Sequence, residues 1–277
     1  MCKVLKISRS SFYHWYRGVP SKRYKENELF TKLIAKEYDL SKKRYGSPKI
    51  GAILRSKGYS ISEKRVAKIM RSNGWFSITK KRFKVTTDSK HKEPICKNIL
   101  NREFKQKRLN QAWVSDITYI KTNTGWLYLT TVIDLYDHQV IGWALSTTMH
   151  TSKTIIPAWN MAVSKRKIEK PLIFHSDRGI QYACKEFRDI LKRNIRITQS
   201  MSRKGNCWDN AVAESFFKIL KSELVYHRKF KNQDQAKIEV FEFIEIWYNR
   251  QRIHASLDYK TPIQMENEFY INQKLAA

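Results

Sequence analysis

Three acidic residues, Asp116, Asp177 and Glu214, stand where carboxylates could take part in a reaction. Asp116 lies within an apolar, β-branched run, where a carboxylate is costly unless it is paired or bound to a metal ion. Asp177 follows the apolar run 172–174 and precedes Gly179, which is typical of the ligand-binding edge of an open sheet. Glu214 begins a predicted helix after a glycine-containing loop. Because carboxylate oxygens suit hard cations, this set predicts a site for Mg²⁺ or Mn²⁺.

The chemistry that fits such a site is phosphodiester cleavage and transfer. Two divalent ions about 3.5–4 Å apart can activate a water or hydroxyl and stabilise the leaving oxygen. Lys218 and Lys221 follow Glu214 by one and two helical turns, so they can reach a nucleic-acid backbone beside the ions. We therefore expect catalysis, metal binding and substrate contact to meet on this helix.

Each acid taken alone has an ordinary explanation. Asp116 could be a hydrogen-bonded strand residue, and Glu214 alone is more often an acid that favours the helix dipole. Asp209 is expected to cap the helix, and Asp134 is a strand-end acid that could enter the site. Glu223 is expected on the outer face, in solvent or in an ion pair. The three carboxylates together, in a basic protein, favour the reaction centre.

The elements that would position these acids begin near Gln111. Two segments rich in β-branched and aromatic residues, 112–122 and 125–146, contain turn signals at 123–125 and 137–138, which predicts a three-stranded antiparallel meander. A helix over about 151–164, a strand ending at Asp177, a helix over about 185–194 and a short strand over 195–200 follow. This order predicts an α/β (α+β) fold with a mixed five-stranded sheet flanked by helices.

The N-terminal region contains two candidate helix-turn-helix segments. The first is short, with Ser8 as the expected cap of its second helix. The second is fuller: Gly58 ends one apolar-striped helix, and the stretch Ser60-Ile-Ser-Glu63 is predicted as a capping box for the next. Four basic residues on this last helix are expected to contact DNA: Lys64, Arg65, Lys68 and Arg71. A plain helical hairpin is the alternative.

The composition favours a polyanionic partner. The formal net charge is +29, and residues 1–100 carry 26 basic and 7 acidic residues, so the N-terminal third holds most of the excess. A solvated basic surface is the alternative. No apolar run is long enough to span a membrane, no signal peptide is present, and the four cysteines form no CxxC pair. We expect an intracellular protein without a structural zinc site.

Three regions are predicted from these changes along the chain. Residues 1–76 form a basic helix-turn-helix region, residues 77–110 a basic linker, and residues 111–270 the catalytic core with C-terminal helices.

Four motifs carry a resemblance to a known family. They read WVSDITYI, FHSDRGIQY, SMSRKGNCWDNAVAESFFKILKSEL and FIEIWYNRQRIHASLDYKTPIQM. In this order they resemble the DDE transposases of the IS-three family of bacterial insertion sequences, specifically the second-frame product with a retroviral-integrase-like core. The resemblance extends over nearly the whole chain, since the stretch YGSPKIGAIL…KRVAKIMRSNGW is similar to the helix-turn-helix of that family.

The resemblance implies an RNase H-like core in which Asp116, Asp177 and Glu214 are the catalytic metal ligands. It implies binding of insertion-sequence ends, Mg²⁺-dependent cleavage that frees a 3′-OH, and strand transfer to target DNA. Further DNA contacts are then expected beside the acidic motifs, from Arg178, Arg203 and Lys204. Four residues belong to the C-terminal motif of the family and are interpreted as packing or DNA contacts, not metal ligands: Tyr248, Asn249, Arg252 and His254. The resemblance also implies a bacterial cytoplasmic, nucleoid-associated protein. The family also implies a homo-oligomer on double-stranded DNA and a first-frame partner or fusion segment.

Two departures from the family pattern are visible. The gap between Asp177 and Glu214 holds 36 residues, one more than the usual spacing, and His138 replaces a common Arg or Lys. The intact motif around Glu214 keeps its assignment. A non-catalytic DNA-binding regulator is the main alternative function, and an RNase H-type nuclease fits the core but not the helix-turn-helix region.

Overall fold

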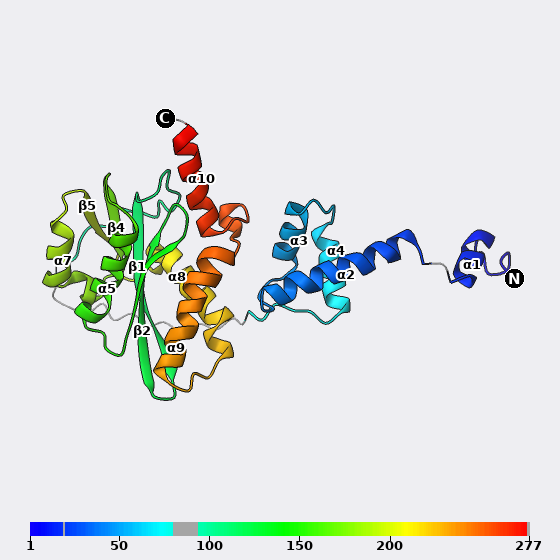
Figure 1. The fold of residues 1–277 in the computed structure, drawn as a ribbon, viewed down its shortest axis with the longest axis horizontal. Helices are drawn as coiled ribbons and strands as arrows, with labels where there is room; N and C mark the ends of the chain where they lie inside the picture. The colour runs from blue at the N-terminus through cyan, green and yellow to red at the C-terminus, as the bar shows by residue number, and fades with distance from the viewer. Residues whose placement is uncertain (19, 80–93, 276–277) are drawn as a thin grey trace. The chain divides into compact units, whose positions relative to one another are not determined.

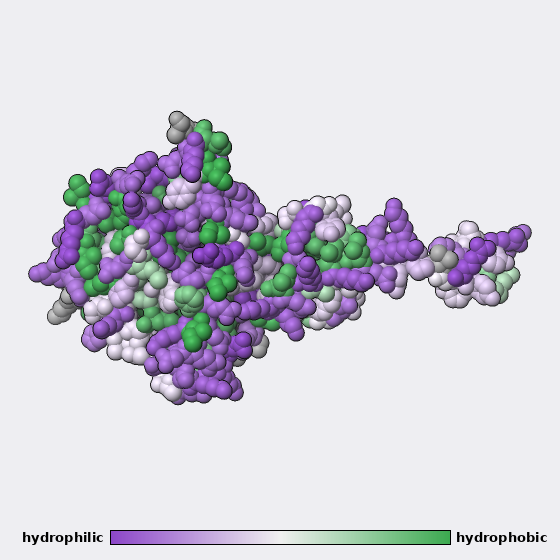
Figure 2. Space-filling view, in the orientation of Figure 1, coloured by the Kyte–Doolittle hydropathy of each residue, from purple (hydrophilic) through white to green (hydrophobic). Residues whose placement is uncertain are grey.

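The computed structural model describes residues 1–18, 20–79 and 94–275. The chain divides into two compact units, Met1–Ile78 and Thr79–Ala277 (Figure 1). Among the described residues, none of the helices combines the length and the apolar character needed to cross a membrane. Hydrophilic residues cover most of the face drawn in Figure 2, with apolar patches between them.

The first unit is built from four helices. They are α1 (Arg9–Tyr16), α2 (Lys22–Leu40), α3 (Ser47–Ser56) and α4 (Glu63–Ser72). Apolar residues at three- and four-residue steps of α2, α3 and α4 form its core: Phe30, Ile34, Ile50, Leu54, Val66 and Ile69. Helix α1 buries none of its residues, although Ser8 caps it as predicted by accepting from the Ser11 amide.

The turn between α3 and α4 confirms one prediction and corrects another. Gly58 follows the end of α3 with φ at +86°, a conformation that glycine adopts without steric cost. The cap of α4, however, is Ser62, whose side chain accepts from the Arg65 amide, and not Ser60. Both serines carry the same hydroxyl group, so their side chains do not show which of them caps the helix. The position at which the helix begins decides it.

The second unit contains the predicted mixed sheet. Its strands are β1 (Ala112–Thr122), β2 (Gly125–Asp134), β3 (Val140–Ser146), β4 (Leu172–Ser176) and β5 (Ile197–Met201), in the order β3-β2-β1-β4-β5. The meander β1-β2-β3 is antiparallel, whereas β4 lies parallel to both β1 and β5. The sheet therefore changes from antiparallel to parallel pairing at β1, which carries Asp116.

Helices cover both faces of this sheet (Figure 1). One face carries α5 (Ile155–Lys165), α6 (Ile180–Ala183) and α7 (Lys185–Lys192). The other carries α8 (Ala211–Glu223) and α9 (Gln233–Phe241), which continues as a π-helical stretch, Glu242–Gln251, before α10 (Pro262–Leu275). Short 3₁₀ turns complete the unit: Thr151–Lys153, Cys207–Asn210, Val225–His227 and Ala255–Leu257.

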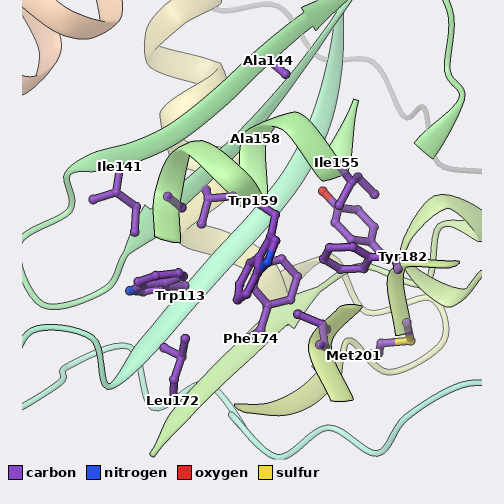
Figure 3. Packing of buried hydrophobic residues seen from close by; sticks show 14 of the residues in the cluster. Trp113, Ile141, Ala144, Ile155, Ala158, Trp159, Leu172, Phe174, Tyr182 and Met201 are labelled. Carbon is purple, nitrogen blue, oxygen red and sulfur yellow. The ribbon is translucent and has the colours of Figure 1, made fainter. Parts of the chain in front are cut away.

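The core under α5 is aromatic. Trp159 of α5 lies between Trp113 of β1 and Phe174 of β4, with ring centroids 5.6 and 5.3 Å apart (Figure 3). Helix α5 approaches β3 closely at Gly142, where a Cβ would lie 2.1 Å from the carbonyl oxygen of Ala158. The absence of a side chain at this position lets the helix pack directly on the sheet.

The C-terminal motif packs inside the second unit. Tyr248 lies edge-on to Phe216 of α8 with ring centroids 4.7 Å apart, and Asn249 bonds both the amide and the carbonyl of Val140. Tyr248, Asn249, Arg252 and His254 are all buried. Of the two interpretations of these residues, packing is the one that the structure shows.

Part of the predicted linker 77–110 lies within the described residues. Leu100 and Leu109 are buried, and the amide of Ile99 donates to Ser200 Oγ at 2.8 Å. Residues 97–100 therefore lie beside β5, and the amide of Asn110 donates to Asp134 at the end of β2. Residues 80–93 of the predicted linker lie outside the described residues.

Candidate active site

Asp116 and Asp177 lie side by side at one edge of the parallel part of the sheet. Ser115 of β1 pairs with Ser176 of β4, so the two aspartates are the next residues of adjacent parallel strands. Adjacent strands lie about 4.8 Å apart, which brings the two carboxylates to one location. Each carboxylate accepts a hydrogen bond from a nearby backbone amide. Asp116 Oδ1 accepts from the Ile117 amide at 2.8 Å, and Asp177 Oδ1 accepts from the Gly179 amide at 2.9 Å.

The direction of the Asp116 side chain follows from strand alternation. Trp113 and Ile117 pack in the core under α5, and Ser115 bonds Tyr182 of α6, so odd-numbered residues of this stretch point to that face. Asp116 consequently points to the opposite face, where α8 packs on β1. Thr131 is its cross-strand neighbour, and the Thr131 hydroxyl is buried without a hydrogen-bond partner among the described residues.

Glu214 comes to this edge on the first turn of α8. The start of the helix is fixed to β1 because Asn210 Nδ2 donates to the carbonyl of Ser115, the residue before Asp116, at 3.0 Å. The Glu214 side chain itself is exposed. Asp116 therefore lies on β1, Asp177 directly follows β4, and Glu214 lies on α8. A direct hydrogen bond joins the start of α8 to β1.

The carboxylates affect one another electrostatically. The pKa of Asp116 is well above its ordinary value, chiefly because of burial and next because of the Asp177 charge, with a smaller contribution from Glu214. Burial and the Asp177 charge also raise the pKa of Glu214. Lys221 opposes the effect at Asp116, and burial lowers the pKa of Lys221 itself. The site thus collects negative charge that a bound cation would stabilise.

Three carboxylate side chains fit a hard divalent cation in their donor chemistry, and the negative charge of Asp177 raises the pKa of the other two. In the described part of the chain, no three His, Cys, Asp or Glu side chains are drawn together closely enough to hold a metal ion as they stand. The fit therefore rests on the donor types, the shared sheet edge and the mutual charge effects.

Asp209 does not cap α8, contrary to the prediction. The residue before this helix is Asn210, and Asp209 is a fully buried acceptor within the preceding loop. It accepts from the amide and guanidinium of Arg203 at 2.8–2.9 Å, from Arg102 Nε at 2.8 Å and from Asn98 Nδ2 at 2.9 Å. Arg203 is the main cause of an Asp209 pKa far below its ordinary value. Asp209 therefore connects two parts of its own loop and joins that loop to the segment 94–110.

Two other acids are also buried in ion pairs away from the three carboxylates. Asp134 accepts from the Trp113 indole at 3.2 Å and pairs with buried Arg166, so it does not enter the site. Glu223 is not on an exposed outer face: it is 4% exposed and pairs with Arg252 at 2.9 Å. The prediction of an ion pair for Glu223 is right, and the expectation of exposure is wrong, because Trp247 of the π-helical stretch and Arg252 pack on that side of α8.

The predicted DNA contacts of the second unit differ in their surroundings. Lys204 and Lys218 are exposed, whereas half-buried Lys221 lies 5.0 Å from the centroid of the Tyr119 ring. Arg178 Nε donates to the carbonyl of Ser202 at 2.6 Å, and Arg203 is held by Asp209 while half of its side chain stays exposed. All five lie on α8 or on the loops that follow β4 and β5.

In the first unit, the basic residues of α4 fall into two groups. Lys64, Lys68 and Arg71 are exposed. Arg65 instead contacts α2: it donates to Glu26 at 3.1 Å and to Asn27 at 2.9 Å, and it lies 4.8 Å from the Phe30 ring centroid. Arg65 therefore connects two helices of this unit.

Sequence reasoning missed the residues that hold the site in place. Asn210 links α8 to β1, and Arg102 with Asn98 reaches the Asp209 loop from a segment about a hundred positions away. His175 was also missed: its ring nitrogens lie 2.9 Å from Ser200 Oγ and 3.3 Å from Ser202 Oγ, and burial lowers its pKa to about 4. Among these residues, only Asn210 has a local signal in the sequence, since it directly follows Asp209, the expected cap of the helix.

Comparisons with known proteins agree with this arrangement. Two family models described as integrase core domain match residues 106–207 and 195–262, and an HTH-like domain matches residues 25–83. Transposase InsF for insertion sequence IS3A of Escherichia coli (strain K12) is 37% identical over 97% of this chain and 93% of its own length. An insertion element IS600 31 kDa protein of Shigella sonnei is 35% identical over 98% of both chains.

Among solved structures, the simian T-cell lymphotropic virus intasome matches 84% of this chain and 73% of its own, with a TM-score of 0.47 and 16% identity. The catalytic domain of Mos1 mariner transposase matches 50% of this chain and 71% of its own, with a TM-score of 0.43 and 14% identity. On the strength of the curated relatives, the chain belongs to the family of insertion-sequence transposases that includes InsF of IS3.

Proposed function

We propose that this transposase binds the ends of its insertion sequence and catalyses divalent-metal-dependent DNA cleavage and strand transfer through Asp116, Asp177 and Glu214. The observation that carries the proposal is the placement of the two aspartates directly after the paired residues Ser115 of β1 and Ser176 of β4, with Glu214 tied to the same edge by Asn210. The raised pKa values of Asp116 and Glu214, to which the Asp177 charge contributes, support a shared cation at this edge.

In this proposal the three carboxylates would hold Mg²⁺ or Mn²⁺. We propose two ions, because two-metal sites are common in enzymes that cleave or join phosphodiesters. When bound, the metal supplies Lewis-acid stabilisation of phosphate oxygens and lowers the pKa of a nucleophilic hydroxyl. The protein's own contribution is positioning. Gly179 and Ile117 orient the aspartates by their amides, Asn210 fixes the helix that carries Glu214, and exposed Lys218 neutralises a DNA phosphate.

The proposed partners are double-stranded element ends and target DNA. The exposed Lys64, Lys68 and Arg71 of α4 are proposed to contact the phosphate backbone, as the HTH-like match supports. One reaction must engage two ends and a target, so a homo-oligomer on DNA is part of the proposal. A first-frame product is the further partner that the family resemblance implies.

The experiment uses labelled duplexes with the sequences that flank the coding region. With the full chain and Mg²⁺ or Mn²⁺, we expect cleavage that frees a 3′-OH and joining of that end to a plasmid target, and we expect neither in EDTA. Binding of the same duplexes without any product, in each divalent cation tried, would instead identify the non-catalytic regulator. Product formed equally well in EDTA would contradict the metal-dependent mechanism.

A further inference from the structure

The tryptophan beside the candidate active site is exposed. Trp208 is 69% exposed, whereas Trp113, Trp159 and Trp247 of the same unit are at most 6% exposed. Within the described residues its indole makes no hydrogen bond and no ring contact, unlike exposed Trp126, which packs edge-on against Tyr119 at 5.2 Å. A single exposed indole is not unusual by itself, but it offers a planar apolar face to a ligand.

The backbone on one side of Trp208 is held by buried residues. Asp209, the next residue, is 0% exposed and accepts from Arg203, Arg102 and Asn98. Asn210, one further, is 3% exposed and bonds β1. The buried charged network therefore fixes the backbone that directly follows Trp208.

The same anchors place the backbone of Trp208 two residues from the contact between Asn210 and β1. Asn210 bonds the carbonyl of Ser115, adjacent to Asp116, and the 3₁₀ turn Cys207–Asn210 runs directly into α8, which carries Glu214 in its first turn. Arg203 and Lys204 stand in the loop that precedes this turn, and both are exposed. A planar aromatic group next to exposed cations is the arrangement that binds an unpaired nucleotide, because the ring stacks on the base and the cations contact the phosphates.

Resting on the proposed function, we infer that Trp208 stacks on an unpaired base next to the scissile phosphate of the DNA end. Bases inside a duplex are already stacked on both faces, so the ligand must be a frayed, overhanging or extruded base. Stacking needs only a π-face and is tolerant of sequence, so the contact would position the end rather than read it. Trp208 is thus a positioning residue for the DNA end.

The test measures binding without chemistry, in EDTA, using the full chain. One probe is a 30-base-pair duplex with a three-nucleotide 5′ overhang that carries 2-aminopurine at the position next to the duplex, and its partner is the blunt duplex of the same sequence. For the wild type we expect quenching of 2-aminopurine on binding. Trp208→Ala should weaken binding of the overhang duplex about tenfold and abolish the quenching, while binding of the blunt duplex changes less than about twofold.

Two further variants separate stacking from general apolar contact. Trp208→Phe, which keeps a ring, should retain the affinity for the overhang duplex within about threefold, whereas Trp208→Leu should behave like Trp208→Ala. The control is Phe241→Ala, which removes a 50% exposed aromatic residue of α9 and should leave both affinities unchanged. Three results would overturn the inference: wild-type affinity of Trp208→Leu for the overhang duplex, wild-type affinity of Trp208→Ala for that duplex, or an equal loss of affinity of Trp208→Ala for the overhang and blunt duplexes.

The outcome is distinguishable from failure of the proposed function. If Mg²⁺-dependent cleavage proceeds in the wild type and 2-aminopurine reports no stacking, the inference fails and the function stands. If stacking is observed and no divalent cation supports cleavage, the function fails and the base contact stands.

Discussion

At Asp116 the fold places a carboxylate where a strand interior is otherwise apolar. Burial alone makes this unfavourable, and the neighbouring Asp177 makes it more so, as the raised pKa of Asp116 shows. The Thr131 hydroxyl opposite it has no hydrogen-bond partner among the described residues. Uncompensated polar groups of this kind are typical of functional sites, where stability is given up for a ligand.

The two lysines of α8 give a prediction about DNA affinity. Lys218 is exposed and Lys221 is half-buried near Asp116, and each is expected to neutralise a phosphate. The double variant Lys218→Ala, Lys221→Ala should reduce the slope of log K against log salt by about 1–2, measured by fluorescence anisotropy on a duplex. Lys165→Ala is the control, because Lys165 pairs with Glu245 at 2.9 Å, and its slope should not change. A slope for the double variant equal to that of the wild type would show that the α8 lysines are only solvated.

Asp209 gives a prediction about pH. Hydrogen bonds from Arg203 hold its pKa far below the ordinary value, so the folded state binds this proton less tightly than the unfolded state. Its contribution to stability is therefore complete above about pH 4 and is lost as the pH falls further towards the folded-state pKa. Asp209→Asn should lower the free energy of unfolding by about 2 kcal/mol at pH 7 and flatten the loss of stability below pH 4.

Thermal unfolding between pH 7 and pH 2.5 measures this effect. Asp234→Asn serves as the matched control, because Asp234 is 81% exposed in its pair with Lys237 and should change stability by less than about 0.5 kcal/mol. An Asp209→Asn variant with the same acid sensitivity as the wild type would show that the Arg203 contact does not set the stability of the loop.

At the scale of elements, the contact of α5 with β3 depends on Gly142. A methyl group there would lie 2.1 Å from the Ala158 carbonyl and 2.9 Å from Ala162 Cβ, both on the packed helix. Gly142→Ala should lower the free energy of unfolding by about 3 kcal/mol, measured by urea denaturation, because neither atom can move without shifting α5. Gly46→Ala, where the new Cβ meets nothing closer than 3.8 Å, should cost less than about 1 kcal/mol. Equal stability of the two variants would contradict the close packing.

The elements themselves could largely be predicted from residue patterns. Alternation and turn residues predicted the meander, and the apolar stripe of α8 predicted its buried residues Ala213, Phe216 and Leu220. The π-helical stretch Glu242–Gln251 was not predicted, because its residues favour an ordinary helix and only its packing distinguishes it. The start of α4 was misplaced by two residues because Ser60 and Ser62 have the same capping chemistry.

At the scale of the whole molecule, contacts between distant segments limit what sequence patterns reveal. The adjacent positions of Asp116 and Asp177, each directly after a residue of the pair Ser115–Ser176, follow from a strand order that the sequence patterns did not predict beyond the antiparallel meander and the mixed sheet. The burial of Asp209 and Glu223 could not be predicted either. Arg102, a partner of Asp209, lies about a hundred positions away, and Arg252, the partner of Glu223, directly follows the π-helical stretch. A local sequence pattern predicts that such an acid is exposed, because the pattern carries no information about a partner elsewhere in the chain.

Asp116, Asp177 and Glu214 are proposed to act together in metal-dependent DNA cleavage and joining. The most direct measurement compares Asp116→Asn, Asp177→Asn and Glu214→Gln with Glu186→Gln, which neutralises an exposed acid in the first turn of α7. Each of the first three should lower the rate of Mg²⁺-dependent strand transfer at least about 1,000-fold while DNA affinity in EDTA stays within about threefold. Glu186→Gln should match the wild type. Wild-type strand transfer by any of the three carboxylate variants would contradict the assignment of that residue to the active site.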